Sequence, residues 1–309
     1  MRTRICTKRQ YSGFTLVELM VVIGILIILM SILIPSISSA FASARSRQDS
    51  VQQRGIYQAM TSYATSNDGK FPLPSTIVDE KLPDPRLNTT SALMSWLIMQ
   101  RFIDYTTTVS PVETNPNIRV IEVADGAHDS TFPYNYDIYG ELNETDGDLY
   151  TDVYYWDPDF NADFTQDTAH SSYAHQALVG QRLRLKWRTG TSATNVVLCN
   201  RGPELSMSAS SLDIVNPNTY TYGFHGSTNQ WQGAAVMGDG TTRMLNSVMP
   251  DDITYAPLDG SLLRSDILFG TEFLDVDDTN PEASGDNWII VTSNDNAEYA
   301  ADNTTPVWD

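Results

Sequence analysis

The stretch Gly13-Phe14-Thr15-Leu16-Val17-Glu18-Leu19 opens a run from Phe14 to Ile34 in which Glu18 is the only charged residue. As a helix, these twenty-one residues would be about 31 Å long, which matches the hydrocarbon core of a bilayer. Basic residues precede the run, and none follows it until Arg45. The positive-inside rule therefore predicts a cytoplasmic N-terminus and a head on the other side of the membrane.

Two ordinary interpretations of this run leave Glu18 unexplained. A secretory signal peptide would have an apolar region of only about 7–15 residues, although Ala40-Phe41-Ala42 and Ala42-Ser43-Ala44 do offer cleavage sites. An uncleaved single-pass anchor fits the length. Neither interpretation accounts for a glutamate five residues into the run, because a carboxylate in lipid costs several kcal/mol unless it is paired or close to the interface.

A third interpretation comes from a resemblance. A short basic leader, a glycine, and then Phe-Thr-Leu-x-Glu-Leu at the head of an apolar helix are the signature of type IV pilins and type II secretion pseudopilins, and Gly13–Ile23 matches it without a break. The resemblance implies that a prepilin peptidase cuts between Gly13 and Phe14 and that the new amine of Phe14 is N-methylated. It also implies a helix kink at Pro35, which lies where the family carries a kinking proline.

Cleavage would create a partner for Glu18. The amine of Phe14 would then lie in or near the bilayer, where Glu18 of a neighbouring subunit could neutralise it and set the axial register of an assembly. The alternative is that Glu18 lies at the depth of the lipid headgroups and has no such partner.

The helix is predicted to continue past the membrane. Apolar residues recur every three or four positions, as on one face of an amphipathic helix, at Phe41, Ala44, Val51, Ile56, Met60 and Tyr63. The turn sequence Ser66-Asn67-Asp68-Gly69 should end it. We therefore expect a leader over residues 1–13, a transmembrane half-helix over 14–37, an amphipathic half-helix over 38–66 and a β-rich globular head over 67–309.

Strand patterns dominate the head after a short helix predicted at Ala92–Phe102, with Leu93, Leu97 and Ile98 inward and Trp96 near the rim. The predicted strands cover residues 118–123, 178–188, 195–199 and 288–292, and a hairpin joins 234–237 to 241–245 through Gly238-Asp239-Gly240. The fold class expected is α+β, with a long N-terminal helix packed on an antiparallel sheet. Two elements, Tyr63–Pro72 and His225 with Asp239-Gly240, resemble large prepilin-like proteins of planctomycetes and carry no implied activity.

The net charge of −19 becomes −23 without the basic leader, which argues against nucleic acid as a partner. Within residues 178–188, basic residues alternate with apolar ones at Arg182, Arg184, Lys186 and Arg188. This basic stripe could be a solvated strand face, could pair with acidic loops of the same head, or could contact an acidic neighbour in a filament.

No catalytic or metal site is assigned. Acidic loops at 157–163, at 146–152 and at 275–280 alternate oxygen ligands, but 157–163 lacks the glycine and the final glutamate of an EF-hand, so calcium stays an open alternative. The four histidines, at 128, 170, 175 and 225, lack zinc spacing, and no nucleophile elbow is present. Cys6 and Cys199 are expected to form no disulfide, and Cys199 is expected to be buried.

The function predicted is therefore structural: a subunit of a type II secretion pseudopilus or a type IV pilus-like filament. Its expected partners are other pilin-like subunits, the prepilin peptidase and an inner-membrane assembly platform. The head is expected in the periplasm, with the filament in the periplasm or on the cell surface. The alternative is a single-pass, membrane-anchored β-rich binding domain, for example one that binds carbohydrate.

Overall fold

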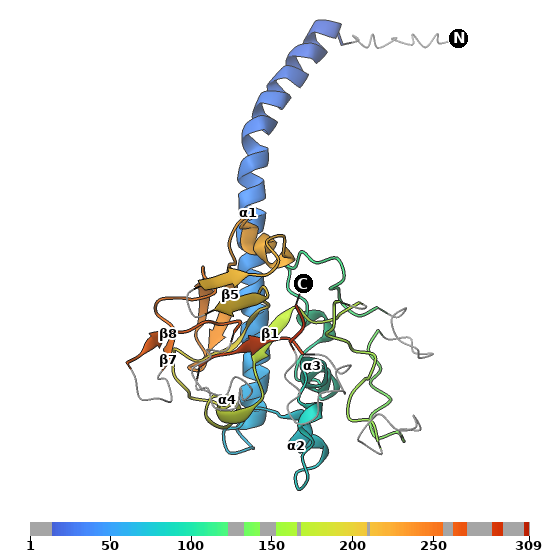
Figure 1. Cartoon of the computed structure of the whole chain (residues 1–309). Coiled ribbons are helices and arrows are strands. Elements are labelled where there is room, and N and C mark those ends of the chain that lie inside the picture. Colours follow the sequence, from blue (N-terminus) through green and yellow to red (C-terminus); the bar gives the residue numbers. More distant parts are fainter. Residues whose placement is uncertain are drawn as a thin grey trace, which may run out of the picture. The chain divides into compact units, whose positions relative to one another are not determined.

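The computed structural model describes residues 14–122, 133–142, 153–165, 168–208, 211–255, 262–270, 286–292 and 306–308. The chain divides into two compact units, Met1–Ala44 and Arg45–Asp309. One helix, α1, runs from Leu16 to Ala64 over 49 residues and contributes to both units. Its second half belongs to the larger unit, the head, where Figure 1 shows it running beside the strands.

Helix α1 ends directly before the turn that the sequence predicts. The helix ends at Ala64, and the backbone N–H of Gly69 returns to the Ala64 carbonyl at 3.0 Å. Asp68 and Gly69 take left-handed backbone angles, with φ of 53° and 74°. Glycine and aspartate adopt this conformation more readily than most residues, which explains why the helix stops at this sequence.

The head is organised on a five-stranded antiparallel sheet in the order β6-β5-β2-β1-β9. Its central strand is completely buried, as expected for the apolar run near residue 196. The α+β architecture predicted from the sequence, a long helix on an antiparallel sheet, is confirmed. The strands of the sheet are β1 (Tyr173–Gln176), β2 (Val196–Asn200), β5 (Gly233–Met237), β6 (Thr242–Leu245) and β9 (Ile289–Ile290).

Two apolar clusters cover the two faces of this sheet. Leu198 and Val236, paired across β2 and β5, belong to the cluster that holds Ile56 and Met60 of α1. The next pair, Cys199 and Ala235, belongs to a second cluster that includes Trp231. Because side chains alternate along a strand, the helix covers one face and the loops of the head cover the other.

Smaller elements complete the head. The helices are α2 (Pro74–Val78), α3 (Thr90–Met99) and α4 (Gly180–Leu185), with 3-10 turns η1 (Pro85–Leu87), η2 (Tyr105–Thr107) and η3 (Tyr220–Gly226). Two small antiparallel pairs, β3 (Leu205–Ser208) with β4 (Ser211–Ile214) and β7 (Thr254–Tyr255) with β8 (Arg264–Ser265), lie outside the main sheet.

Helix α3 begins two residues before the predicted start at Ala92 and ends three residues before the predicted end at Phe102. The Thr89 hydroxyl accepts a hydrogen bond from the Ala92 backbone at 3.1 Å and caps the helix. At the other end Arg101 has φ of 58°, and Phe102 and Arg101 donate backward to the Leu97 and Ile98 carbonyls. This is a Schellman ending, with arginine in the position that usually favours glycine. The expectation for Trp96 was wrong, because its side chain is buried with the rest of α3.

The strand predicted at 178–188 was wrong, because residues 180–185 form helix α4. The expected alternation fails at two positions, because Arg182 is fully buried and Leu185 is 62% exposed. Arg182 can point inward because Asp286, 104 residues away, pairs with it inside the head. The strand predicted at 118–123 is reduced to one isolated bridge, Ile118 with Ala169, and residue 123 lies outside the described residues.

The strand β1, which the sequence analysis missed, carries a buried histidine. The Nε2 atom of His175 lies 3.0 Å from the Thr90 hydroxyl and its Nδ1 atom lies 2.9 Å from the Gln176 carbonyl. The carbonyl can only accept, so Nδ1 carries the proton and Nε2 accepts from Thr90. Burial lowers the pKa of His175 to about 4. The neutral ring thus joins β1 to the first turn of α3.

We predict that His175 makes the head less stable in acid. Unfolding restores the ordinary pKa near 6.5, so the unfolded chain binds a proton between pH 6.5 and 4 that the folded chain does not. Stability is lost as pH falls through this window, by up to about 3 kcal/mol. Denaturant unfolding of the full chain in detergent, followed at pH 7.5, 6 and 4.5, measures it.

The control for this prediction is His175→Gln, which keeps an acceptor for Thr90 and cannot titrate. Burial raises the pKa of Asp266 to about 7, which adds stability as pH falls, and this contribution is the same in both proteins. The difference between the two proteins should therefore grow in favour of the variant as pH falls. An unchanged difference from pH 7.5 to 4.5 would contradict the prediction.

Candidate functional site

Thr15 and Glu18 cap the start of α1 by hydrogen-bonding to each other. The backbone N–H and the hydroxyl of Thr15 donate to Oε2 of Glu18 at 2.9 and 2.7 Å, and the Glu18 N–H donates to the Thr15 hydroxyl at 3.2 Å. This is a capping box, which satisfies backbone donors that a helix start leaves open. The sequence analysis missed it, although Thr-x-x-Glu before an apolar run is its signature.

The helix that follows is apolar on all sides. From Phe14 to Ile37 every large apolar side chain is exposed, and Phe14 itself is 84% exposed. Among the described residues, α1 is the helix long and apolar enough to cross a membrane, with mean hydropathy 3.0 in its most apolar window. Side chains exposed around the whole helix suit a lipid environment, since a helix in water buries one face.

The few polar groups in this stretch are satisfied within the helix. Ser31 donates its hydroxyl to the Ile28 carbonyl at 2.7 Å, and Ser38 donates to the Ile34 carbonyl at 3.0 Å. Pro35 lies inside α1 and has no N–H to continue the ladder. In lipid such hydroxyl bonds avoid unsatisfied polar atoms, and a proline is tolerated where neighbouring groups compensate. The kink at Pro35 stays a prediction, and Gly13 lies outside the described residues.

In the head, α1 carries a second acidic residue, Asp49, which is fully buried. One carboxylate oxygen, Oδ1, accepts hydrogen bonds from Ser110 at 2.5 Å, Tyr173 at 3.0 Å and Asn200 at 3.1 Å. The other, Oδ2, accepts from Gln53 at 3.1 Å. The donors come from α1, a loop, β1 and β2, so one carboxylate joins four segments of the chain.

His225 completes the Asp49 cluster. Its Nε2 atom lies 3.6 Å from Oδ2 of Asp49, and its Nδ1 atom lies 2.8 Å from the Ser46 hydroxyl. Burial raises the pKa of Asp49, against the hydrogen bonds from Ser110 and Asn200, and burial lowers the pKa of His225, against the charge of Asp49. His225 holds a left-handed backbone, with φ of 53°. The cluster therefore fixes η3 against α1, and the Asp239-Gly240 turn forms the separate β5–β6 hairpin.

The four side chains of the basic stripe lie in different environments, some buried and some exposed. Arg182 pairs with Asp286 inside the head, and burial lowers the pKa of Lys186 to about 8. Arg184 and Arg188 are exposed. Pairing with acidic residues of the same head is therefore correct for Arg182, while the two exposed arginines remain available for a ligand or neighbour.

The acidic loops that the structure describes use their carboxylates locally. Asp157 accepts hydrogen bonds from the Asn135 and Asp159 backbones, and Asp163 accepts from the Thr165 backbone. In the described parts of the chain, no group of three or more His, Cys, Asp or Glu side chains could hold a metal. The acidic segments 146–152 and 275–280, His128 and Cys6 lie outside the described residues. Cys199 is buried, as predicted, and burial raises the pKa of its thiol.

A comparison with known protein families finds a match for the N-terminal segment. The family model described as the prokaryotic N-terminal methylation motif matches residues 8–34. The match includes the Gly13–Phe14 junction, the Thr15–Glu18 capping box and the apolar run. No curated protein and no solved structure matches the chain. These comparisons therefore assign no function to the head.

We predict that Asp49→Asn destabilises the head strongly. The amide keeps the shape of the side chain, but its NH₂ group meets donors that the carboxylate satisfied, so the free energy of unfolding should fall by about 3 kcal/mol. Chemical denaturation of the detergent-solubilised chain measures the change. Asp252→Asn is the matched control, because Asp252 pairs with Arg243 at the surface and should contribute less than about 1 kcal/mol. Equal effects of the two substitutions would contradict the role of Asp49.

Proposed function

Because the chain carries the prepilin-type N-terminal methylation motif of type IV pilin-like proteins, we propose that it is a structural subunit of a type II secretion pseudopilus or a type IV pilus-like filament. The single observation that carries the proposal is the motif match over residues 8–34, joined to a helix long and apolar enough to cross a membrane. Proteins of this kind are typically not enzymes.

Maturation would begin with cleavage between Gly13 and Phe14 by prepilin peptidase. Cleavage removes the basic leader, and N-methylation modifies the new amine of Phe14. The mature chain would then start two residues before α1, with Glu18 as its fifth residue. Both steps are proposals supported by the motif and by the residues at the junction.

Membrane anchoring follows from α1 and its flanking charges. The apolar half would span the inner membrane, with the leader on the cytoplasmic side and the head in the periplasm. Assembly would then draw subunits into a helical array through head-to-tail contacts, which extend without closing. Prepilin peptidase, an inner-membrane assembly platform and other pilin-like subunits are the partners that this proposal requires.

Glu18 has two roles in this proposal. Within one chain, its carboxylate accepts two hydrogen bonds from Thr15 and caps the helix. In the assembly, the charge of Glu18 would attract the methylated amine of Phe14 on the next subunit and fix the axial offset. The two roles can be separated, because capping requires only an acceptor atom whereas the attraction requires a negative charge.

The proposal predicts a defined N-terminus for the mature chain. Chain expressed with a prepilin peptidase and extracted from membranes should begin at N-methyl-Phe14, as measured by intact-mass and N-terminal peptide mass spectrometry. Chain expressed without the peptidase is the control and should retain its leader. A chain that begins after Ala42 or Ala44, or that keeps Met1 in the presence of the peptidase, would overturn the proposal.

Two substitutions separate the charge of Glu18 from its capping of the helix. Glu18→Gln keeps an oxygen that can accept from Thr15 and removes the charge, so it should insert, mature and then fail to assemble. Thr15→Val removes the hydroxyl, keeps the charge and should still assemble, with helix stability reduced by about 1 kcal/mol.

The measurement is the fraction of mature subunit in sheared or sedimented filaments, with mass spectrometry confirming the same N-terminus in all three proteins. Normal assembly of Glu18→Gln would show that the charge is not needed. Loss of assembly in Thr15→Val but not in Glu18→Gln would assign the role to capping.

A further inference from the structure

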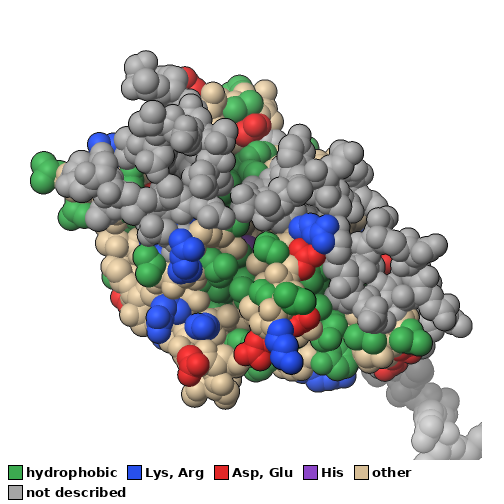
Figure 2. All heavy atoms as spheres, turned by 60° about the horizontal axis from the view of Figure 1, so that its bottom comes forward, with side chains coloured by type: hydrophobic (Ala, Val, Ile, Leu, Met, Phe, Trp, Pro, Cys, Tyr) green, Lys and Arg blue, Asp and Glu red, His purple; other side chains and the backbone are tan. Residues whose placement is uncertain are grey.

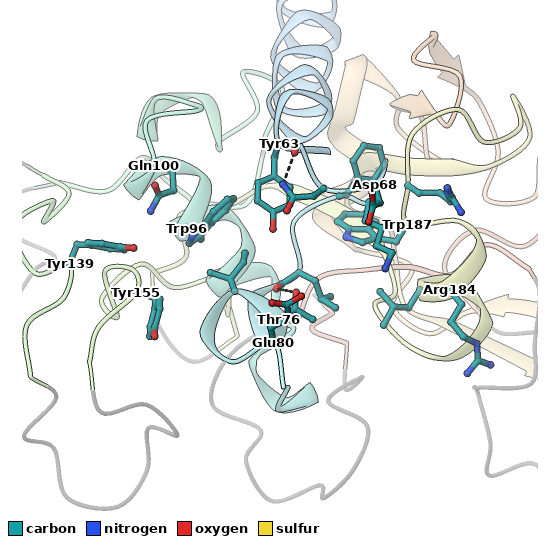
Figure 3. Close-up of a pocket in the computed structure, with 17 residues that line it drawn as sticks. Tyr63, Asp68, Thr76, Glu80, Trp96, Gln100, Tyr139, Tyr155, Arg184 and Trp187 are labelled. Atoms are coloured by element: carbon teal, nitrogen blue, oxygen red, sulfur yellow. Dashed lines mark hydrogen bonds between the residues drawn. The ribbon is translucent and has the colours of Figure 1, made fainter. Parts of the chain in front are cut away.

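A groove lies at the end of the head where α1 finishes. It encloses about 910 Å³, within the range of ligand sites. Its lining comes from the end of α1, the turn after it, α2, α3, two loops and the segment from α4 to Arg188. Figure 3 shows Trp96, Tyr139 and Tyr155 on one side and Trp187 and Arg184 on the other.

Aromatic residues form much of the groove lining, and three tyrosines, Tyr63, Tyr139 and Tyr155, expose part of their rings. Tyr139 is 52% exposed and stands edge-on to Tyr155, with ring centres 6.4 Å apart. Tyr63 stands edge-on to Trp96 at 5.2 Å. An edge-on partner supports a ring from one side and leaves a face free for a ligand. Tyr63 and Tyr155 are half-buried, so the groove holds them while exposing part of each ring.

Five charged side chains surround these rings: Asp68, Lys70, Glu80, Arg184 and Arg188. All five are exposed, and within the described parts of the chain none of them forms an ion pair. Figure 2, which brings this end of the molecule forward, shows basic and acidic side chains interspersed with hydrophobic surface. The groove therefore combines open rings with hydrogen-bonding groups of both signs.

This combination favours a ligand with apolar ring faces and a periphery of hydroxyl groups. A sugar ring can lay its C–H face on an aromatic ring while its hydroxyls bond to carboxylates and guanidinium groups. A strongly anionic polymer is disfavoured, because Asp68 and Glu80 lie in the groove and the whole chain carries −19. A purely apolar ligand would leave the charged groups desolvated and unpaired.

An extended peptide is the main competing occupant. Peptides commonly bind by adding a strand to an open sheet edge. The lining residues lie in helices, turns and loops, and none belongs to a named strand of the described sheets. Trp187 is also fixed, because its indole N–H donates to the Pro72 carbonyl at 3.0 Å. Its side chain is buried, so it supports the wall of the groove and offers no donor to a peptide backbone.

We propose that this groove is an oligosaccharide-binding site, in which Tyr139 and the neighbouring Tyr155 stack on sugar rings and Arg184, Asp68 and Glu80 bind hydroxyl groups. The site goes beyond filament assembly, since it gives the head a ligand that the N-terminal segment does not require. It also joins the two classes of function that the sequence left as alternatives, because an assembled subunit can carry a binding site on its head.

The test is titration calorimetry of the detergent-solubilised full chain with linear hexasaccharides of β-linked glucose, xylose and N-acetylglucosamine, and with a flexible glutamate-rich peptide. At least one hexasaccharide should bind with a Kd below about 1 mM. Tyr139→Ala and Arg184→Ala should each weaken that binding about tenfold or more without lowering the unfolding midpoint. Both side chains are exposed, so neither substitution should impair folding.

Tyr220→Ala is the matched control, because Tyr220 is a comparably exposed tyrosine outside the groove, and it should leave the affinity unchanged. The proposal is overturned if no hexasaccharide binds, or if both groove variants bind it as tightly as the unsubstituted chain does. It is also overturned if only the peptide binds and Arg184→Ala abolishes that binding, which would identify a protein-docking surface. The N-terminal maturation assay is independent of all these outcomes.

Discussion

Asp49 places a carboxylate on the face of α1 that the head covers, and the head surrounds it with donors from four segments. Removing a carboxylate from water is costly unless hydrogen bonds replace the lost hydration. Ser110, Tyr173 and Asn200 provide that replacement from a loop, β1 and β2. Each of these segments must therefore occupy its native place before the carboxylate is satisfied. The arrangement ties the register of the helix to the register of the adjacent strands β1 and β2.

The apolar packing around Asp49 lacks such directional constraint. Ile56 and Met60 could slide by a turn and still bury their side chains, because contacts between apolar groups are non-directional. The Tyr57 hydroxyl adds one more fixed point, since it donates to the Gly238 carbonyl at 2.9 Å, at the turn of the β5–β6 hairpin. The polar bonds of Asp49 and Tyr57 thus define one position for the second half of α1, and packing supplies most of the stabilisation.

Sequence patterns predicted the features whose causes are local. The apolar run, the helix exit at Asp68-Gly69, the buried strand β2 and the β5–β6 hairpin all depend on residues close together in the chain. The patterns failed where a distant partner decides the structure. Arg182 points inward because of Asp286, and Asp49 is buried because β1 and β2 supply donors. Strand β1 was missed for a related reason: its polar residues His175 and Gln176 are satisfied only by contacts made after folding.

Glu18 has hydrogen-bond partners within its own chain that the sequence analysis missed. A lone carboxylate near lipid demands a partner, and from sequence the nearest candidate is the amine of a neighbouring subunit. The capping box supplies a partner within the same chain, at 2.7 and 2.9 Å. The cost of placing this charge near lipid is therefore not enough, by itself, to imply a partner subunit. What supports the filament is the combination of this residue with the Gly13–Phe14 junction and the apolar helix. In the proposed filament, local capping would have a physical use, because it would keep the carboxylate satisfied until the amine of a neighbouring subunit reached it.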